Sequence, residues 1–525
     1  MYIAHPGRAL FHRQLVTLDR MSSSSSLPLV PLPAQIECGT GTLLVSGFRI
    51  VLGNGLHDDE RWLGTVTAEL SGSNIPVSTG NLGDGLIDLR LELLPTPPDP
   101  AEVFGVYELD IVDHVRITAR DRHGILNGLR TLNQLAQRSP LPRLKITDEP
   151  RYLWRGLSVD VVRHWYGFAA LIRIVELISA YKLNYLHLHL TDDQGWRIEI
   201  PTYPALTELS SRSQVGGLLP ESERGYLTLA EYRDLQEYAA SRGVTIVPEI
   251  DLPGHTRAAL HAIPELNDDG IAPPLYFGTE VGHSLLRLAN PATKPFIETV
   301  INTVSENTLG EWIHIGGDES PLLADDEYRA LVGIANEAVL ANGKRAVAWQ
   351  EAAKLATVPS PTGRAEPFPL LQFWIPIIDL KPLFAALGQG ARLIMSPGDR
   401  AYLDMKYDDD DPLGLAWAGT FDLAKARSWD PESYLAAAAP TGQQIPQGVI
   451  HGVEAAVWSE TCRSLADLEA LLFPRLAAIA EVAWSGANGQ ANFIERLKPH
   501  AALWRKWGFP ASTLDRLAAA SDASS

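Results

Sequence analysis

From Arg151 onward, short apolar segments alternate with longer segments whose apolar residues recur at helical spacing. This alternation is typical of βα units that share a parallel sheet. Eight such strands with helices in roughly 340 residues predict an α/β fold, a (β/α)8 TIM barrel with insertions. The expected strands are 156–163, 185–192, 244–251, 312–319, 345–351, 370–374, 392–397 and 452–460, with helices between them that include 168–181, 229–242, 293–307 and 325–341.

The residues before this alternation have a different pattern. Short β-like runs at 42–52, 86–94 and 107–118 are separated by Gly, Pro and Asp, and the segment 122–137 carries apolar residues on one helical face. We therefore expect a small α+β accessory domain over residues 27–150, which ends in the proline-containing polar segment before Pro150. Residues 1–26 predict a flexible leader, and residues 151–525 predict the catalytic barrel with C-terminal helices.

Charge and composition exclude several classes of partner. The 44 Lys and Arg against 63 Asp and Glu give a formal net charge of -19, which argues against nucleic acid or an anionic membrane. No apolar run reaches the ~18 residues of a membrane-spanning helix. The first residues lack the pattern of a secretory signal, so a cytoplasmic location is favoured. Cys38 and Cys462 imply no disulfide framework, and no pattern indicates the oligomeric state.

The fourth expected strand ends in Gly316-Gly317-Asp318-Glu319. Two glycines allow a sharp turn, and the carboxyl ends of barrel strands hold the catalytic groups in such enzymes. Ionisation of one of two adjacent acids raises the pKa of the other, which can provide one proton donor and one anion at neutral pH. Taken alone, an Asp-Glu pair after a strand is more often the start of a helix.

Most of the other expected strands also end in polar or aromatic residues. Each of these has a structural explanation when it is considered singly, but the carboxyl ends of all strands would meet at one rim. Several Trp rings with scattered carboxylates suit a sugar, because the rings stack on its apolar face while charged groups bind its hydroxyls. The residues are Arg163, Asp192, Asp251, His255, Trp349, Glu351, Trp374, Tyr402, Asp404, Trp458 and Glu460.

Ordered motifs give a more specific assignment. The stretches RYLWRGLSVDVVRH from Arg151, HLHLTDDQGWR from His187, VPEIDLPGH from Val247 and HIGGDE from His314 resemble the β-N-acetylhexosaminidases, family 20 of the glycoside hydrolases. The later stretches AWQE, QFW, SP through YLD, and EAAVWSE match in the same order. The resemblance covers the whole barrel, and the preceding domain resembles the accessory α+β domain of this family.

The resemblance implies an exo-acting hydrolase that releases terminal N-acetylglucosamine or N-acetylgalactosamine with retention of configuration and without a cofactor. In this family the 2-acetamido oxygen of the substrate is the nucleophile and forms an oxazolinium intermediate. By the same resemblance, Glu319 would be the general acid and base, Asp318 would hold the acetamido N–H, and Tyr402 would donate to the acetamido oxygen.

The resemblance assigns supporting roles to the remaining candidates. Trp349, Trp374 and Trp458 would enclose the acetamido methyl group. Asp192 and His255 would form a polar relay to the general acid. The sugar hydroxyls and the neighbouring sugar would be bound by Arg163, Asp404, Glu460 and Trp417.

Two alternatives remain at this point. A metal-dependent barrel hydrolase would use His187, His189, His255 and Asp318 as ligands, although a regular strand would place Asp192 on the face opposite the first two. A non-catalytic sugar-binding protein would have lost the acid, yet both adjacent acids are present. We expect no metal, and activity in the presence of a chelator would reject the metal-dependent alternative.

Two insertions interrupt the barrel pattern. The proline-rich segment 359–369 is expected to be a surface loop. The four acids at 408–411 are expected to form a solvated loop, with a cation site as the lesser alternative.

Overall fold

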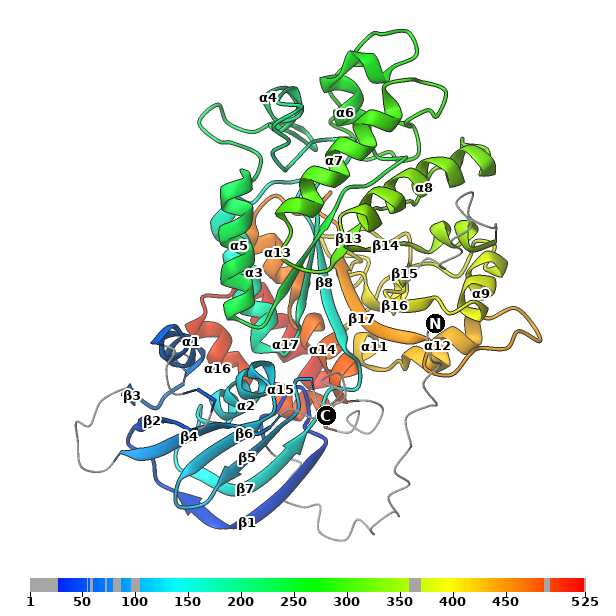
Figure 1. Cartoon of the computed structure of the whole chain (residues 1–525). Helices are drawn as coiled ribbons and strands as arrows, with labels where there is room; N and C mark the ends of the chain where they lie inside the picture. The colour runs from blue at the N-terminus through cyan, green and yellow to red at the C-terminus, as the bar shows by residue number, and fades with distance from the viewer. Residues whose placement is uncertain are drawn as a thin grey trace.

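The computed structural model describes residues 27–53, 55–56, 60–70, 73–78, 86–95, 104–357, 370–485 and 492–523. The expected leader 1–26 and the loop 359–369 lie outside these residues. A mixed sheet with two helices forms the N-terminal part, and a closed parallel barrel follows it (Figure 1). The expected fold, a TIM barrel preceded by an α+β domain, is confirmed.

The accessory domain is a seven-stranded sheet in the order β1-β7-β5-β6-β4-β2-β3. Helices α1 (Glu60–Leu70) and α2 (Arg122–Leu135) cover the face of the sheet that is turned toward the barrel (Figure 1). Asp121 caps α2 by accepting a hydrogen bond from the Gly124 N–H. The strands are β1 (Gln35–Leu43), β2 (Phe48–Leu52), β3 (Val77–Ser78), β4 (Ile87–Leu93), β5 (Tyr107–Ile111), β6 (Val115–Ala119) and β7 (Leu141–Asp148).

The segment before Pro150 is a strand and not only a border. β7 pairs antiparallel with both β1 and β5, so it lies inside the sheet. Its sequence did not indicate a strand because Pro142 lacks an N–H for the ladder. The structure tolerates Pro142 near the start of β7, where it pairs with Thr42 next to a register shift between Cys38 and Thr42.

All eight expected barrel strands are present, and they pair in parallel in the closed order β12-β13-β14-β15-β16-β17-β8-β9. Helices α3 (Phe168–Ala180), α5 (Leu229–Ser241), α7 (Thr293–Asn307) and α8 (Asp325–Ala341) lie on the outside, as the sequence predicts (Figure 1). The strands are β8 (Trp154–Asp160), β9 (Tyr185–His189), β12 (Thr245–Glu249), β13 (Trp312–His314), β14 (Arg345–Trp349), β15 (Leu370–Phe373), β16 (Arg392–Met395) and β17 (Ile450–Val457).

Every barrel strand ends before its expected carboxyl end. The largest difference is in β13, which ends at His314 and not at Glu319. The polar residues after each strand leave the ladder because their side chains turn into the mouth of the barrel. Regular pairing would send alternate residues outward into the helical layer.

The barrel interior is layered. At the amino-terminal ends of the strands it is apolar, and the residues there are Trp154, Val247, Trp312, Val347, Leu370 and Ile394. Above this layer lies a buried polar cluster around Glu249. One oxygen of Glu249 accepts a hydrogen bond from Trp349 Nε1 at 2.8 Å and lies 3.1 Å from His314 Nδ1. The other lies 2.6 Å from His189 Nδ1 and 3.1 Å from His187 Nε2. This cluster supports the floor of the mouth.

A buried ion pair joins the two domains. Lys182 Nζ, which follows α3 in the barrel, lies 3.0 Å from the carboxylate of Asp148 at the end of β7. The same carboxylate accepts hydrogen bonds from the Tyr107 hydroxyl at 2.7 Å and from Trp484 Nε1 at 3.0 Å. Trp484 belongs to the C-terminal helix α14 (Arg475–Ser485), so three parts of the chain meet at one carboxylate.

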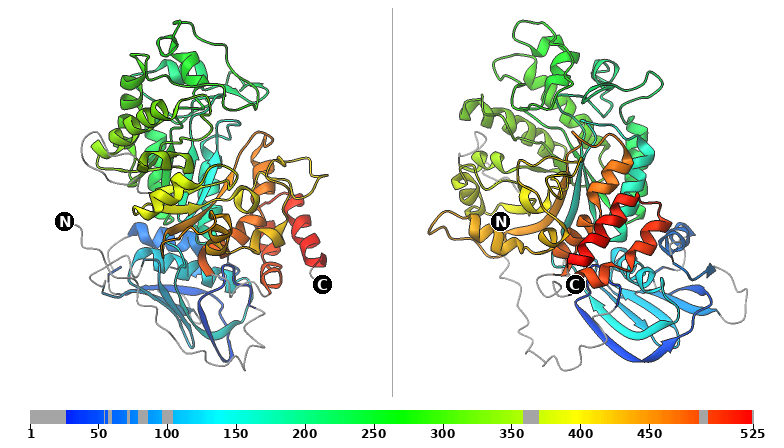
Figure 2. Two further views of the ribbon diagram at one scale, coloured as in Figure 1. Left: turned by 90° about the vertical axis from the view of Figure 1, so that its right-hand side faces the viewer. Right: turned by 180° about the vertical axis from the view of Figure 1, so that it is seen from behind.

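The C-terminal helices complete the barrel side of the molecule. Helices α16 (His500–Lys506) and α17 (Ala511–Ala523) pack together beside the barrel, near the accessory domain (Figure 2). Arg516 of α17 forms an ion pair with Asp411 at 2.5 Å. The expectation of a solvated loop at 408–411 is therefore wrong for Asp411, which is buried, whereas the three acids before it are exposed. Among the described residues, no helix is both long and apolar enough to span a membrane.

Candidate active site

A cavity of about 1000 Å³ opens at the carboxyl ends of the barrel strands. All the candidate site residues line it except Trp349 and Asp404. Trp349 is buried beneath it, with its ring centroid 6.0 Å from that of Trp458. The candidates among its lining residues are Arg163, Asp192, His255, Asp318, Glu319, Trp374, Tyr402, Trp417, Trp458 and Glu460.

The turn after β13 places the two adjacent acids in different surroundings. Gly316 has a φ of 66°, and a Cβ there would lie 1.7 Å from an oxygen of Asp251, so only glycine fits. The Asp318 side chain is 11% exposed, and that of Glu319 is 32% exposed. Glu319 itself has a φ of 43°, a strained conformation for a residue with a side chain and one that is concentrated at functional sites.

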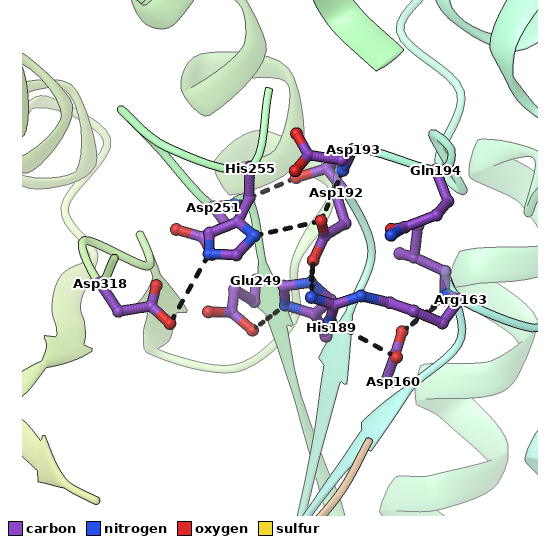
Figure 3. Close-up of polar contacts among 12 residues, drawn as sticks. Asp160, Arg163, His189, Asp192, Asp193, Gln194, Glu249, Asp251, His255 and Asp318 are labelled. Carbon is purple, nitrogen blue, oxygen red and sulfur yellow. Dashed lines mark hydrogen bonds and ion pairs between the residues drawn. The ribbon is translucent and has the colours of Figure 1, made fainter. Parts of the chain in front are cut away.

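A chain of polar contacts leads from the barrel interior to both acids. Arg163 lies 2.8 Å from Asp192, and Asp192 lies 3.1 Å from His255 Nδ1. His255 Nε2 then lies 3.4 Å from Glu319 and 3.9 Å from Asp318. Figure 3 shows His255 between Asp192 and Asp318. The expected relay residues are thus brought together.

One expectation about this chain is wrong. Asp192 does not lie on the face opposite the histidines of β9, because its carboxylate is 2.7 Å from His189 Nε2. The strand ends at His189, so the alternation of side chains no longer applies at Asp192.

The surroundings of these groups shift their pKa values in opposite directions. Burial raises the pKa of Asp318 to about 6, and the charge of Glu319 adds to the rise while His255 opposes it. Burial alone would lower the pKa of His255, but the carboxylates of Asp192 and Asp251 outweigh it and raise that pKa well above its usual value. Likewise, Arg163 and His255 overcome the effect of burial and hold the pKa of Asp192 well below its usual range. A charged imidazolium therefore faces both acids at neutral pH.

Three ionisable side chains near the mouth have buried polar atoms without a hydrogen-bond partner in the described part of the chain. They are Arg163 Nε, one oxygen of Glu460 and both oxygens of Asp404. Burial and the charge of Glu460 raise the pKa of Asp404 well above its usual range. Buried polar atoms are normally paired, so this arrangement fits a polar ligand that carries several hydroxyl groups.

Aromatic rings form the other wall of the cavity. The rings of Trp374 and Tyr402 are nearly parallel, at 11°, with centroids 6.5 Å apart. Trp417 stands edge-on to both and is 47% exposed, and Trp458 lies 6.2 Å from Tyr402. Burial raises the pKa of Tyr402 well above its usual value, so its hydroxyl stays protonated and can donate a hydrogen bond.

Several residues of the site were not assigned a role from the sequence. Asp251 accepts a hydrogen bond from the Gly317 N–H at 3.0 Å, and the Tyr328 hydroxyl donates to the Gly317 carbonyl at 2.5 Å. Glu351 lines the cavity beside Trp374. Asp251 and Glu351 stand at the ends of expected strands, and this position is the sequence signal that indicates a place in the site. Tyr328 lies within α8, and no feature of the sequence indicates that it belongs to the site.

The geometry also separates the proposed metal ligands. His255 and Asp318 lie in one group of close ligand atoms together with Asp251, whereas His187 lies in another with Glu249 and His314. The four ligands of the metal-dependent alternative therefore do not surround one common position.

Comparison with known proteins identifies the family. The model for the catalytic domain of glycosyl hydrolase family 20 matches residues 152–330 and 324–487. The chain belongs to this family. Domain 2 of family 20 matches residues 26–149. The protein is therefore a glycoside hydrolase, and this excludes a non-catalytic sugar-binding protein.

Known hexosaminidases match most of the chain. The β-N-acetylhexosaminidase of Cellulomonas fimi is 39% identical over an alignment of 492 residues that covers 92% of this chain and 95% of that protein. The β-hexosaminidase of Akkermansia muciniphila is 32% identical over 441 residues, covering 78% of this chain and 86% of its own. The Streptomyces plicatus N-acetyl-β-hexosaminidase, solved in complex with Thio-NAglucal, superposes with a TM-score of 0.79 at 35% identity and covers 92% and 96% of the two chains.

Proposed function

We propose that this family 20 hydrolase is an exo-acting, retaining β-N-acetylhexosaminidase. It releases terminal N-acetylglucosamine or N-acetylgalactosamine from oligosaccharides or glycoconjugates, and the acetamido group of the substrate is the nucleophile. The observation that carries the proposal is the pairing of a buried Asp318 with a more exposed Glu319 beside the parallel rings of Trp374 and Tyr402. The Vibrio harveyi exo-β-N-acetylglucosaminidase, 26% identical, was solved with N-acetylglucosamine, which supports this substrate class.

In the first step, the acetamido oxygen attacks the anomeric carbon and the bond to the leaving oxygen breaks. Glu319 protonates that oxygen, a contribution of about 10²–10⁴-fold for leaving groups that need a proton. Asp318 accepts a hydrogen bond from the acetamido N–H and offsets the positive charge of the oxazolinium ring. The Tyr402 hydroxyl donates to the acetamido oxygen and orients it, which gives an intramolecular nucleophile an effective molarity of about 10⁵–10⁸ M.

In the second step, Glu319 removes a proton from water, and the water oxygen adds to the anomeric carbon as the ring reopens. Asp192 and His255 supply a fixed charge beside Glu319 during both steps. Arg163, Glu460 and Asp404 would bind the sugar hydroxyls with the atoms that have no partner within the described residues. Trp417, exposed at the mouth, would contact the neighbouring sugar.

Turnover and stereochemistry test the proposal. The wild-type protein should hydrolyse an aryl β-N-acetylglucosaminide, and proton NMR of the first product should show the β-anomer. A thiazoline analogue of the cyclic intermediate should inhibit competitively. An α-anomer as first product, or no inhibition by the thiazoline at millimolar concentration, would reject the mechanism.

A further inference from the structure

Glu351 is a carboxyl group in the cavity wall that the reaction above does not use. It is the second residue of the 3-10 helix η4 (Gln350–Thr357), which follows β14 directly. The side chain is partly buried and lines the same cavity as Asp318 and Glu319. Burial and the charge of Asp318 raise the pKa of Glu351 to about 8, so this position disfavours the ionised form of the carboxyl group. Such a residue requires an explanation.

The contact that distinguishes Glu351 is its hydrogen bond with Trp374. The indole Nε1–H lies 3.2 Å from each of the two carboxyl oxygens. An indole has one donor and no acceptor, so this bond fixes the rotation of the ring about its side-chain bonds. Elements β14 and β15 are adjacent in the barrel, and the bond therefore ties the ends of two neighbouring strands.

The orientation of Trp374 decides the shape of the aromatic wall. Its ring is nearly parallel to Tyr402 and edge-on to Trp417, with centroids 6.5 and 5.8 Å away. A rotation of the indole would change the space between these rings, where the resemblance to the family places the acetamido group. Small displacements matter in such a site, because a misplacement of about 1 Å can cost about 10²-fold in rate.

We propose that Glu351 is a positioning residue that holds the indole of Trp374 and thereby keeps the substrate amide folded toward the anomeric carbon. This inference rests on the proposed function. It assigns to Glu351 no contact with the reacting atoms and no proton transfer. Its whole effect passes through Trp374.

A double-mutant cycle tests this path of action. Glu351→Leu removes the acceptor at similar size, and Trp374→Phe removes the donor while a ring remains. On an aryl N-acetylglucosaminide, each single variant should lower kcat by about 10- to 100-fold, with a smaller change in KM, because the nucleophile is misplaced more than binding is lost. The double variant should be no worse than the poorer single variant. If the two losses multiply, Glu351 acts independently of Trp374 and the proposal is overturned.

The conservative variant Glu351→Gln is the matched control. Its amide oxygen can still accept from the indole, so kcat should stay within about threefold of wild type at pH 7. A loss as large as that of Glu351→Leu would overturn the proposal, because the carboxyl group itself would then be required. Gln differs little in size from Glu, which keeps this comparison usable if the Leu variant does not fold.

The indole proton gives a readout that does not need activity. In protein labelled with ¹⁵N-Trp, the Nε1–H resonance of Trp374, assigned from its absence in Trp374→Phe, should be retained in Glu351→Gln. It should shift or broaden in Glu351→Leu. An unchanged resonance in Glu351→Leu would overturn the proposal even if the wild-type enzyme proved inactive on N-acetylglucosaminides. Wild-type inactivity alone would instead reject the proposed function.

Discussion

The acid limb of the pH–rate profile should belong to Asp318. In the proposed mechanism this group acts as an anion, because only the anion both accepts from the acetamido N–H and offsets the positive charge of the oxazolinium ring. Its pKa is about 6, since burial and Glu319 oppose its ionisation. The ionised fraction then falls from about nine-tenths at pH 7 to about one-tenth at pH 5. kcat/KM should therefore fall about tenfold over this interval.

The assay measures initial rates on an aryl N-acetylglucosaminide, well below KM and at constant ionic strength, from pH 4.5 to pH 8. The isosteric Asp318→Asn variant should lose about 10²–10³-fold at pH 7, because a neutral amide cannot offset the developing charge. Its remaining activity should no longer decline toward pH 5. Asp326→Asn, an exposed acid in the first turn of α8, is the control and should keep the wild-type profile.

The prediction fails in two ways. If Asp318→Asn retains an acid limb with the same midpoint, another group causes the limb. If the wild-type midpoint lies near pH 4, the buried position of Asp318 does not raise its pKa as the contacts imply.

Three further outcomes are expected. Glu319→Gln should lose about 10²–10⁴-fold on a natural disaccharide but far less on an activated aryl glycoside, which needs no proton, and equal losses would contradict its role as the acid. Asp318→Asn should also be the more stable protein above pH 6, by up to about 3 kcal/mol in the free energy of unfolding. In the wild type, the folded state gains stability from protonated Asp318 below the ordinary pKa of 3.8, and this gain is lost as pH rises through about 6. Thermal unfolding of the wild type and of Asp318→Asn should therefore show no difference below pH 4. Asp148→Asn should lose about 3–5 kcal/mol in urea unfolding because it leaves the Lys182 ammonium buried without its partner, whereas a loss below about 1 kcal/mol would show that the pair is dispensable.

The order of elements in the barrel could be predicted because each strand is a short apolar run and each helix has a clear apolar face. The expected helices 293–307 and 325–341 have the bounds of α7 and α8. The strand ends could not be predicted in the same way. Residues such as Asp192 and Glu319 follow apolar runs in the sequence, but both leave the ladder and lie beside His255, which belongs to a distant part of the chain.

The accessory domain shows the limits of local pattern. The sequence does not indicate strand β7, because Pro142 suggests an interruption, although β1 and β5 pair with the strand on both sides. Asp411 was assigned to a solvated loop because its partner, Arg516, lies more than a hundred residues away in α17. A single sequence does not indicate which residues so far apart form an ion pair.

Most residues of the candidate site could be predicted, and so could the relay from Asp192 through His255 to Glu319, but the other contacts of the site could not. Asp318, Glu319 and Tyr402 were singled out from strand ends and family motifs, and all three line the cavity. The hydrogen bond between Glu351 and Trp374, by contrast, depends on the relative rotation of β14 and β15. No spacing rule fixes that rotation.

The cavity contains more acids than bases, and burial, together with the charge of neighbouring acids, raises the pKa of Asp318, Glu351 and Asp251. A small organic cation that entered this space would relieve that repulsion and bind without resembling a sugar in any other respect. We therefore expect a small organic cation to compete with substrate here more readily than an anion such as phosphate. By the same reasoning, an inhibitor with a basic ring nitrogen should suit the excess of acids in this cavity.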